Sequence, residues 1–259
     1  MHQYNQVLVQ KEGSLLILTI NRPDSNNRIN RETGNEMIDV ITKANDDSEV
    51  KVIIITGTGE YFCGGGDIDN YPQGPLIDQK NYTDSFWGVH EAIYRSRKPI
   101  LGAIQGHAIA GGFSITEACD MAFTGKSCMF GMPEIERALF PMVALATTGK
   151  NIPKKKLLEI CFTAKKIDAE TAKQLYLVNE VVADDLVLEH TKKVAREISE
   201  FSGAALAFGR EAYYRMNNMS LSNALEYSRV ALLGLLCTED AKNYAMSKIN
   251  GTSPMIKNY

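Results

Sequence analysis

Two glycine-rich turns, each placed directly after an apolar run, constrain the fold of this chain more than any other feature. The run Val52–Ile55 leads into Phe62–Gly66, and the run Pro99–Ile104 leads into Gly106–Ser114. Short apolar runs bounded by turn residues predict buried strands, and residues 115–121 indicate a helix start. A strand, a tight glycine turn and a helix N-terminus make an anion site, because the first N–H groups of a helix lack intrahelical partners and carry partial positive charge.

The two turns together predict more than either turn alone. Turns that follow neighbouring strands can aim two backbone N–H groups at one oxygen, which is the geometry of an oxyanion hole, worth about 2.7–4 kcal/mol per donor. A single glycine pair after a strand most often only makes a turn. Gly111 and Gly112 lack the Cβ atoms that would block a close approach, and this favours the functional interpretation.

The apolar pattern predicts an α/β chain followed by helices. Alternating strands and helices imply parallel pairing through crossovers, and residues 7–20 predict a hairpin. The expected strands are 7–9, 15–20, 52–55, 100–103 and 121–124, and the expected helices are 30–44, 83–96, 111–118, 186–201, 203–216, 220–237 and 238–250. Residues 69–82, rich in proline, glycine and polar side chains, predict a mobile loop over the site. We therefore expect a core at residues 1–184 and a helical region at residues 185–259 that covers the core and forms subunit contacts.

Composition and charge are typical of a soluble globular protein. The 259 residues are 44% hydrophobic and 23% charged, and the formal net charge is -3, so bulk charge predicts no nucleic-acid partner. No apolar run approaches the roughly 20 residues that cross a bilayer. The five cysteines have no spacing typical of a metal site, and an odd count without a secretory leader favours a reducing compartment. We expect a cytoplasmic protein with no metal and no membrane partner.

Motifs in a fixed order cover nearly the whole chain. They are Asn21-Arg22-Pro23, Phe62–Ile68, Lys98–Gly112, Cys119-Asp120 and Phe130–Ile135, followed by residues 164–182. In this order and spacing they resemble the crotonase superfamily, which is the enoyl-CoA hydratase/isomerase family. The resemblance implies a crotonase-like spiral of repeated β-β-α units, an acyl-CoA substrate and a homotrimer or dimer of trimers. It implies no separate cofactor, since CoA enters as part of the substrate.

The resemblance also implies roles for individual residues. Gly66 and Gly111 match the backbone donors of the family's oxyanion hole, and Glu134 matches its second catalytic carboxylate, which moves a proton beside the acyl thioester. From the residues alone, Glu134 after Pro133 is also a plain helix-start signal. Five further positions match residues that lie along CoA: Asn27, Arg28, Gly64, Ile68 and, across a subunit boundary, Lys248.

Ser114 departs from the family pattern, because hydratases of the family usually carry a second glutamate at this position. Two carboxylates serve the syn addition of water well, whereas moving a double bond needs only one base that takes a proton and returns it. Ser114 therefore favours isomerisation slightly over hydration. Glu117, one helical turn later, either restores a second carboxylate or is an ordinary solvated helix residue. Ser114 itself either hydrogen-bonds a water or supports the first turn of its helix.

Other interpretations compete with this one. Thioester hydrolysis, decarboxylation or C–C cleavage would use the same oxyanion hole, and a non-catalytic acyl-CoA-binding subunit would need none. Intact glycine turns and Glu134 argue against the binding subunit. His90, His107 and Cys63 suggest base or nucleophile roles, but the sequence favours structural roles for all three. The apolar segment Arg137–Ala144 matches the wall of the acyl pocket in relatives and predicts an apolar acyl group.

Overall fold

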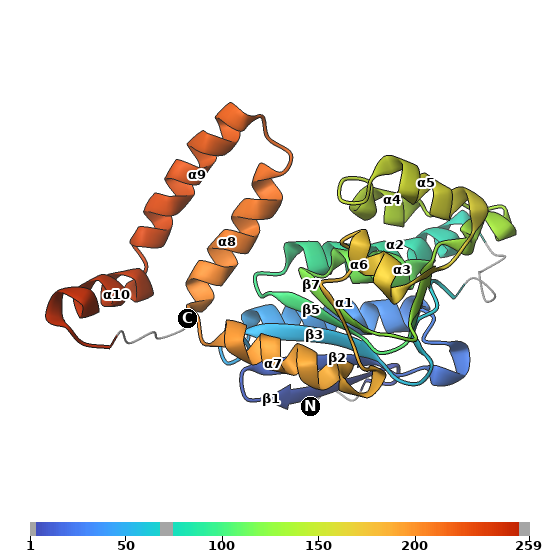
Figure 1. Ribbon diagram of the computed structural model, residues 1–259, viewed down its shortest axis with the longest axis horizontal. Coiled ribbons are helices and arrows are strands. Elements are labelled where there is room, and N and C mark those ends of the chain that lie inside the picture. Colours follow the sequence, from blue (N-terminus) through green and yellow to red (C-terminus); the bar gives the residue numbers. More distant parts are fainter. Residues whose placement is uncertain (1–3, 68–74, 254–259) are drawn as a thin grey trace.

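A computed structural model describes residues 4–67 and 75–253, and its larger sheet has six strands. Their order across the sheet is β1-β2-β3-β5-β7-β10. β1 and β2 form the predicted antiparallel hairpin, and the other pairings in this sheet are parallel (Figure 1). The strands are β1 (Val7–Glu12), β2 (Leu15–Ile20), β3 (Val52–Gly57), β5 (Ile100–Ile104), β7 (Met121–Gly125) and β10 (Glu180–Val182).

The second sheet is smaller and is built from short strands. Its order is β4-β6-β8-β9, with β4, β6 and β8 parallel and β9 antiparallel to β8. The strands are β4 (Tyr61–Cys63), β6 (His107–Ile109), β8 (Met129–Gly131) and β9 (Ile167–Asp168). Along the chain, β3 leads into β4, β5 into β6 and β7 into β8. This alternation between the two sheets is the spiral of β-β-α units that the resemblance implies.

Helices surround both sheets and continue beyond them. α1 begins after Asn30, whose side chain accepts a hydrogen bond from the Thr33 N–H at 2.8 Å, as its position before the helix predicts. The α-helices are α1 (Arg31–Asp46), α2 (Leu76–Arg95), α3 (Gly111–Ala118), α4 (Met142–Thr148), α5 (Lys154–Thr163), α6 (Ala169–Gln174), α7 (Val187–Ser199), α8 (Gly203–Met216), α9 (Leu221–Leu236) and α10 (Glu239–Asn250). Short 3-10 turns are η1 (Pro23–Ser25), η3 (Pro133–Arg137) and η4 (Asp184–Leu186).

The predicted loop at residues 69–82 is partly wrong. α2 begins at Leu76, so the second half of that segment is helical, and residues 69–74 lie outside the described residues. Pro75 directly precedes the first helical residue, and proline is tolerated at that end of a helix because no intrahelical N–H is needed there. The polar residues that suggested a loop include Lys80, which forms an ion pair with Asp84 one turn along α2.

Helices cover both faces of the larger sheet, and this explains its continuous apolar strands. In β3, Val52 and Ile54 pack with Val187 and Ala195 of α7, while the alternate residues face the opposite cluster with α1. α7 therefore covers one face of the sheet, although it belongs to the predicted helical region. No helix in the described part of the chain combines the length and apolarity that a bilayer crossing requires.

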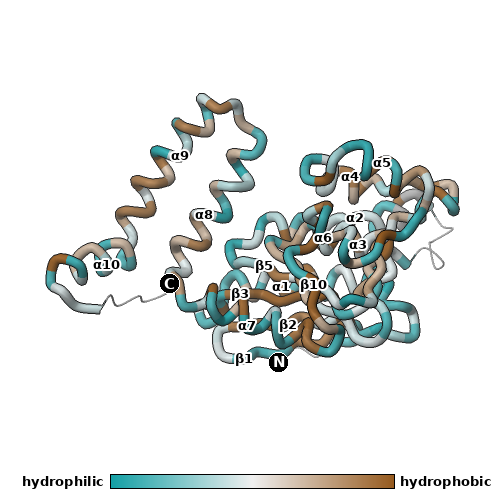
Figure 2. Tube along the Cα trace, in the orientation of Figure 1, coloured by the Kyte–Doolittle hydropathy of each residue, from teal (hydrophilic) through white to brown (hydrophobic). Residues whose placement is uncertain are grey.

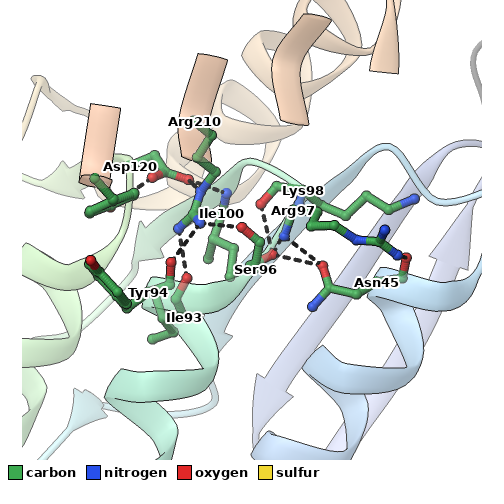
Figure 3. A network of polar contacts seen from close by, with 10 residues as sticks. Asn45, Ile93, Tyr94, Ser96, Arg97, Lys98, Ile100, Asp120 and Arg210 are labelled. Atoms are coloured by element: carbon green, nitrogen blue, oxygen red, sulfur yellow. Dashed lines mark hydrogen bonds and ion pairs between the residues drawn. The ribbon is translucent and has the colours of Figure 1, made fainter. Parts of the chain in front are cut away.

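One buried arginine attaches α8 to the rest of the chain. Arg210 of α8 donates to Asp120 Oδ2 at 2.7 Å and to three backbone carbonyls at the end of α2, those of Ile93, Tyr94 and Ser96 (Figure 3). The carbonyls at a helix C-terminus lack intrahelical partners, and the guanidinium has five donors in a fixed fork. Arg210 therefore holds the C-terminal end of α2 and the start of β7 against α8.

Beyond α8 the helices leave the body of the molecule, as Figure 1 shows for α9 and α10. Apolar residues follow α9 along its length (Figure 2). Six of its large apolar side chains are exposed: Leu221, Leu225, Val230, Leu232, Leu233 and Leu236. The sequence predicts packing of residues 231–236 against the core or another subunit, and the core of the same chain does not supply that contact.

Replacing Arg210 by methionine should weaken the fold strongly. The change keeps an unbranched stem but leaves a partly buried carboxylate and three carbonyls short of donors, so we expect a loss of about 3 kcal/mol in the free energy of unfolding. Urea denaturation measures it. Arg215→Met is the matched control, because Arg215 pairs with Glu211 on the exposed surface of the same helix and its loss should leave the free energy of unfolding nearly unchanged. Equal losses in the two variants would contradict the anchoring role.

Candidate active site

Three parallel strands bring the glycine turns and Glu134 to one edge of the smaller sheet. β4, β6 and β8 are neighbours and run in the same direction, so the segments that follow them leave from the same edge. Those segments are Gly64–Gly66 after β4, Ala110-Gly111 after β6 and Met132–Glu134 after β8. The Ala110 N–H donates to the Gly131 carbonyl at 2.7 Å and holds the second and third segments together. Ligand sites of parallel sheets commonly form at this edge.

The two glycine turns lie in direct backbone contact. Gly65 has a φ of +99°, and a Cβ atom there would lie 2.7 Å from the Ala110 Cβ and 3.2 Å from the Gly111 nitrogen. A Cβ atom on Gly112 would run into the carbonyl oxygen of Cys63. Glycine is therefore required at 65 and 112 for the turns to approach each other.

Both turns present backbone N–H groups that have no acceptor among the described residues. Gly66 forms a β-bridge with Ile29 through two hydrogen bonds. The Ile29 N–H donates to the Gly65 carbonyl, and the Asp67 N–H donates to the Ile29 carbonyl, so the bridge does not use the Gly66 N–H. Gly111 is the first residue of α3, where an N–H has no intrahelical acceptor. Neither the Gly66 nor the Gly111 N–H donates to any group in the described residues. Unpaired backbone donors are uncommon in folded proteins, so two on touching turns mark a candidate binding site.

The loop around Asn27 holds the first turn in place. The Asn27 side chain accepts from the Arg22 N–H at 2.7 Å and donates to the carbonyls of Thr58 and Tyr61 at 2.7 and 2.6 Å. The Arg22 guanidinium pairs with Asp67 at 3.0 Å, directly after the turn. Asn27 has no exposed surface. All polar atoms of its side chain are therefore committed to the backbone of its own chain, and the predicted contact of position 27 with CoA stays a prediction.

Glu134 carries a carboxylate oxygen that is buried without a partner. The residue is the second of η3, directly after Pro133, and its Oε2 makes no hydrogen bond in the described part of the chain. Burial raises the pKa of Glu134 above its ordinary value, while its own backbone N–H and the charge of Arg137 act in the opposite direction. A partly buried carboxylate with one unpartnered oxygen and a pKa raised by burial is typical of a functional site.

Ser114 and His90 form a buried pair that the sequence does not predict. The Ser114 Oγ lies 2.8 Å from His90 Nε2, and burial lowers the pKa of His90 to about 4, so the imidazole is neutral at physiological pH. The side chains lie on α3 and α2, which the sequence does not place in contact. Only the packing of the two helices reveals the pair.

Glu117 lies in a different environment from Glu134. Its carboxylate accepts from Asn151 and faces Thr147 of α4, and burial raises its pKa. It lines a cavity of about 1010 Å³ between α3, α4 and α8, whose lining includes His90 and Arg210. Neither the candidate oxyanion donors nor Glu134 line this cavity. In the described part of the chain the Glu117 carboxylate therefore contacts Asn151 and Thr147.

The other predicted CoA contacts are distributed unevenly. Arg28 packs beside Gly64: a Cβ atom added to Gly64 would lie 3.4 Å from the Arg28 Cγ and closer still to Asn26. Arg28 and Gly64 therefore border the first turn. Ile68 lies outside the described residues. Lys248 is exposed on α10, with its ammonium 5.3 Å from the Tyr244 ring centre. α10 is separated from the body of the molecule that carries Arg28 and Gly64 (Figure 1), so one chain does not bring Lys248 to them.

His107 and Cys63 have structural surroundings. His107 Nδ1 accepts from the Met129 N–H at 3.2 Å, and its ring packs edge-on against Tyr61, so it joins three strands of the smaller sheet. Cys63 is fully buried, and burial raises the pKa of its thiol to about 12. A thiol that stays protonated at neutral pH is no nucleophile.

Comparisons with known proteins agree on one family. A family model described as enoyl-CoA hydratase/isomerase matches residues 10–247. A probable enoyl-CoA hydratase of Mycobacterium bovis is 30% identical over 252 residues, which cover 97% of each chain. A short-chain-enoyl-CoA hydratase of Clostridium acetobutylicum is 29% identical over 243 residues, 93% of each. A crystal structure of an enoyl-CoA hydratase from Mycobacterium smegmatis matches with a TM-score of 0.92 at 22% identity, covering 97% of this chain and 99% of that one, and confirms the fold.

Replacing Asn27 by alanine should destabilise the chain rather than only weaken a ligand. The change leaves the Arg22 N–H and two carbonyls without their partner in a fully buried site, so we expect a loss of about 2–4 kcal/mol in the free energy of unfolding. Chemical denaturation of the ligand-free protein measures it. Asn217→Ala, at an exposed helix end, is the control and should shift stability by less than about 0.5 kcal/mol. An Asn27 variant of unchanged stability would return this residue to the set of ligand contacts.

Replacing Glu134 by glutamine should stabilise the protein at neutral pH and not at acidic pH. A carboxyl whose pKa is raised in the folded state makes folding less favourable once it ionises, and this cost disappears below its ordinary value of 4.5, where both states are protonated. Melting temperatures at pH 7.5 and pH 4 measure the difference. Glu136→Gln, an exposed neighbour, should change neither value. A variant that melts below the wild type at pH 7.5 would show that the carboxylate is paired after all.

Proposed function

The chain belongs to the enoyl-CoA hydratase/isomerase family, and from this premise we propose that it is an enzyme that moves or hydrates the double bond of an enoyl-CoA. The observation that carries the proposal is the unpaired carboxylate of Glu134 at the sheet edge where two touching turns present free N–H groups. A thioester oxygen bound by Gly66 and Gly111 would be polarised there, and Glu134 would exchange a proton with the adjacent carbon.

The two backbone donors act where charge develops. Removing a proton from the α-carbon of an enoyl-CoA places negative charge on the thioester oxygen, and donors aimed at that oxygen bind the enolate more strongly than the neutral thioester. The turns are rigid because Gly65 and Gly112 hold them in contact. The donors therefore need little rearrangement as the charge appears.

Glu134 suffices for isomerisation. Its carboxylate takes a proton from the α-carbon of a 3-enoyl-CoA, the enolate forms, and the resulting carboxylic acid returns the proton at the γ-carbon to give the conjugated 2-enoyl-CoA. Burial raises the pKa of Glu134, and this favours the abstraction step, since a carboxylate that binds a proton more tightly is the stronger base. Hydration needs a second group that accepts a proton from water, and the Glu117 carboxylate already accepts a hydrogen bond from Asn151. Isomerisation is thus the reaction that Glu134 supports by itself.

CoA binding and assembly complete the proposal. Arg28 and Gly64 border the first turn, where the nucleotide part of CoA would pass. By the resemblance, Ile68 would contact CoA as well. Lys248 would reach that CoA from a neighbouring subunit of a homotrimer or dimer of trimers. Exposed apolar side chains along α9 support such an assembly, because a surface of this kind is usually covered. We place the enzyme in the cytoplasm and assign it no separate cofactor.

Paired assays test the proposal. The protein is incubated with a short 3-enoyl-CoA and, separately, with a 2-enoyl-CoA, and products are followed by mass and by the absorbance of the conjugated thioester. We expect Glu134→Gln to lower kcat by about 10²–10⁴-fold in both reactions, and the exposed Glu136→Gln to leave it unchanged. Isomerisation at wild-type rate by the Glu134 variant would contradict the role of Glu134.

A wild-type protein that performs neither reaction would overturn the proposal. If that protein bound CoA thioesters and formed another product, the result would favour thioester hydrolysis, decarboxylation or C–C cleavage. If it bound them and formed no product, the result would favour a non-catalytic acyl-CoA-binding subunit. Intact free N–H groups at Gly66 and Gly111 suit the first of these outcomes, because all three reactions also pass through charge on the thioester oxygen.

A further inference from the structure

The buried pair of Ser114 and His90 is not used by the isomerisation described above. The Ser114 Oγ lies 2.8 Å from His90 Nε2 and 3.0 Å from the carbonyl oxygen of Gly111. His90 Nδ1 lies 3.1 Å from the carbonyl oxygen of Phe86, one turn earlier on α2. Ser114 is 1% exposed and His90 is 6% exposed. Four polar groups therefore form a continuous chain of three contacts that is almost closed to solvent.

A count of hydrogen-bond donors shows that this hydrogen-bond network of Phe86, His90, Ser114 and Gly111 can accept one more proton. Both carbonyls only accept, a neutral imidazole supplies one N–H, and serine supplies one O–H, so two protons serve three contacts. When His90 Nδ1–H donates to the Phe86 carbonyl, the Ser114 hydroxyl can donate either to His90 Nε2 or to the Gly111 carbonyl, but not fully to both. A proton added at Nε2 lets His90 donate to Ser114 and Ser114 donate to Gly111, and all three contacts are then satisfied.

Helix packing places this hydrogen-bond network at the candidate oxyanion turn. Gly111 supplies both the free N–H and the carbonyl that contacts Ser114. Phe86 covers the same residue, since a Cβ atom on Gly111 would run into its ring, and the rings of Phe86 and His90 lie 5.1 Å apart. One face of α2 therefore lies against the first turn of α3. Ser114 stands at the position where the resemblance expects the second glutamate of a hydratase.

We propose that His90, acting through the hydroxyl of Ser114, provides the second proton acceptor of the site, so that the enzyme hydrates a 2-enoyl-CoA without a second carboxylate. This inference rests on the proposed function and extends it. Ser114 would contact the attacking water, and His90 would be its positioning residue and proton store.

The proposed step balances without a further reagent. The oxygen of water bonds to the β-carbon, the π electrons of the double bond shift to form the thioester enolate, and one water proton passes to Ser114 as the Ser114 proton passes to His90 Nε2. The carboxylic acid form of Glu134 then protonates the α-carbon. The imidazolium of His90 and the carboxylate of Glu134 finally exchange the proton through solvent. One water has been added, and every residue has regained its starting state.

Two single variants separate the two reactions. Ser114→Ala removes the relay, and His90→Gln keeps a polar group near Nε2 that accepts no proton at working pH. We expect each variant to lose hydration by at least about 100-fold and to keep isomerisation within about threefold. The double variant should be no slower than either single one, because residues that act as a unit lose their function once. Melting temperatures verify folding, and His190→Gln, on α7, is the histidine control that should change neither rate.

A rescue variant tests the chemical role directly. Ser114→Glu in the His90→Gln background puts a carboxylate back at the position of the relay, and it should restore hydration at least tenfold over His90→Gln alone. If Ser114→Ala fails to fold, His90→Gln and Ser114→Cys carry the test, since both preserve the size of the buried group.

The outcomes distinguish this inference from the proposed function. A wild type that isomerises without hydrating overturns the inference alone, as do variants that keep full hydration. Equal loss of hydration and isomerisation in the variants shows a merely structural pair and also overturns it. A wild type that performs neither reaction overturns the proposed function itself. Selective loss of hydration with rescue by the carboxylate supports the relay.

Discussion

The parallel pairing of β4, β6 and β8 is the constraint on which the rest of the site depends. Each strand is only three residues long, yet together they decide where three separate turns leave the sheet. The longer strands β3, β5 and β7 directly precede them along the chain and are buried on both faces, so the alignment of the longer strands also aligns the short ones. A shift of one short strand would separate the N–H of Gly66 from that of Gly111, or Glu134 from both.

Unsatisfied polar groups gather at this edge and are rare in its surroundings. The buried polar groups nearby, such as Asn27 and Asp67, have partners, whereas the N–H groups of Gly66 and Gly111 and the Oε2 of Glu134 have none among residues 4–67 and 75–253. Leaving a buried donor or acceptor unpaired costs about 1–3 kcal/mol for each group. The fold tolerates this cost because other contacts hold the turns in place. These contacts are made by the loop of Asn27 and Arg22 and by the packing of Gly65 against Ala110.

The sequence predicts the parts of this site that depend on local pattern. Glycine turns after apolar runs, the helix cap at Asn30 and the helices α8 to α10 follow from turn chemistry and periodicity. The inward direction of the Asn27 side chain does not follow, because its partners at Thr58 and Tyr61 lie more than thirty residues away. The Ser114–His90 pair and the contacts of Glu117 with Asn151 and Thr147 likewise arise from helix packing. The start of α2 was misplaced because polar, proline-flanked residues suit a loop and the first turn of a helix equally.

The Arg210 anchor joins α8 to the same end of α2 that carries His90. α2 is a stiff rod: near one end Arg210 grips the carbonyls of Ile93, Tyr94 and Ser96, and one turn away, at about 1.5 Å of rise per residue, His90 meets Ser114. The contact that fixes α8 and the contact that fixes α3 thus lie within two turns of each other on α2, so one short stretch of this helix sets the positions of both neighbours.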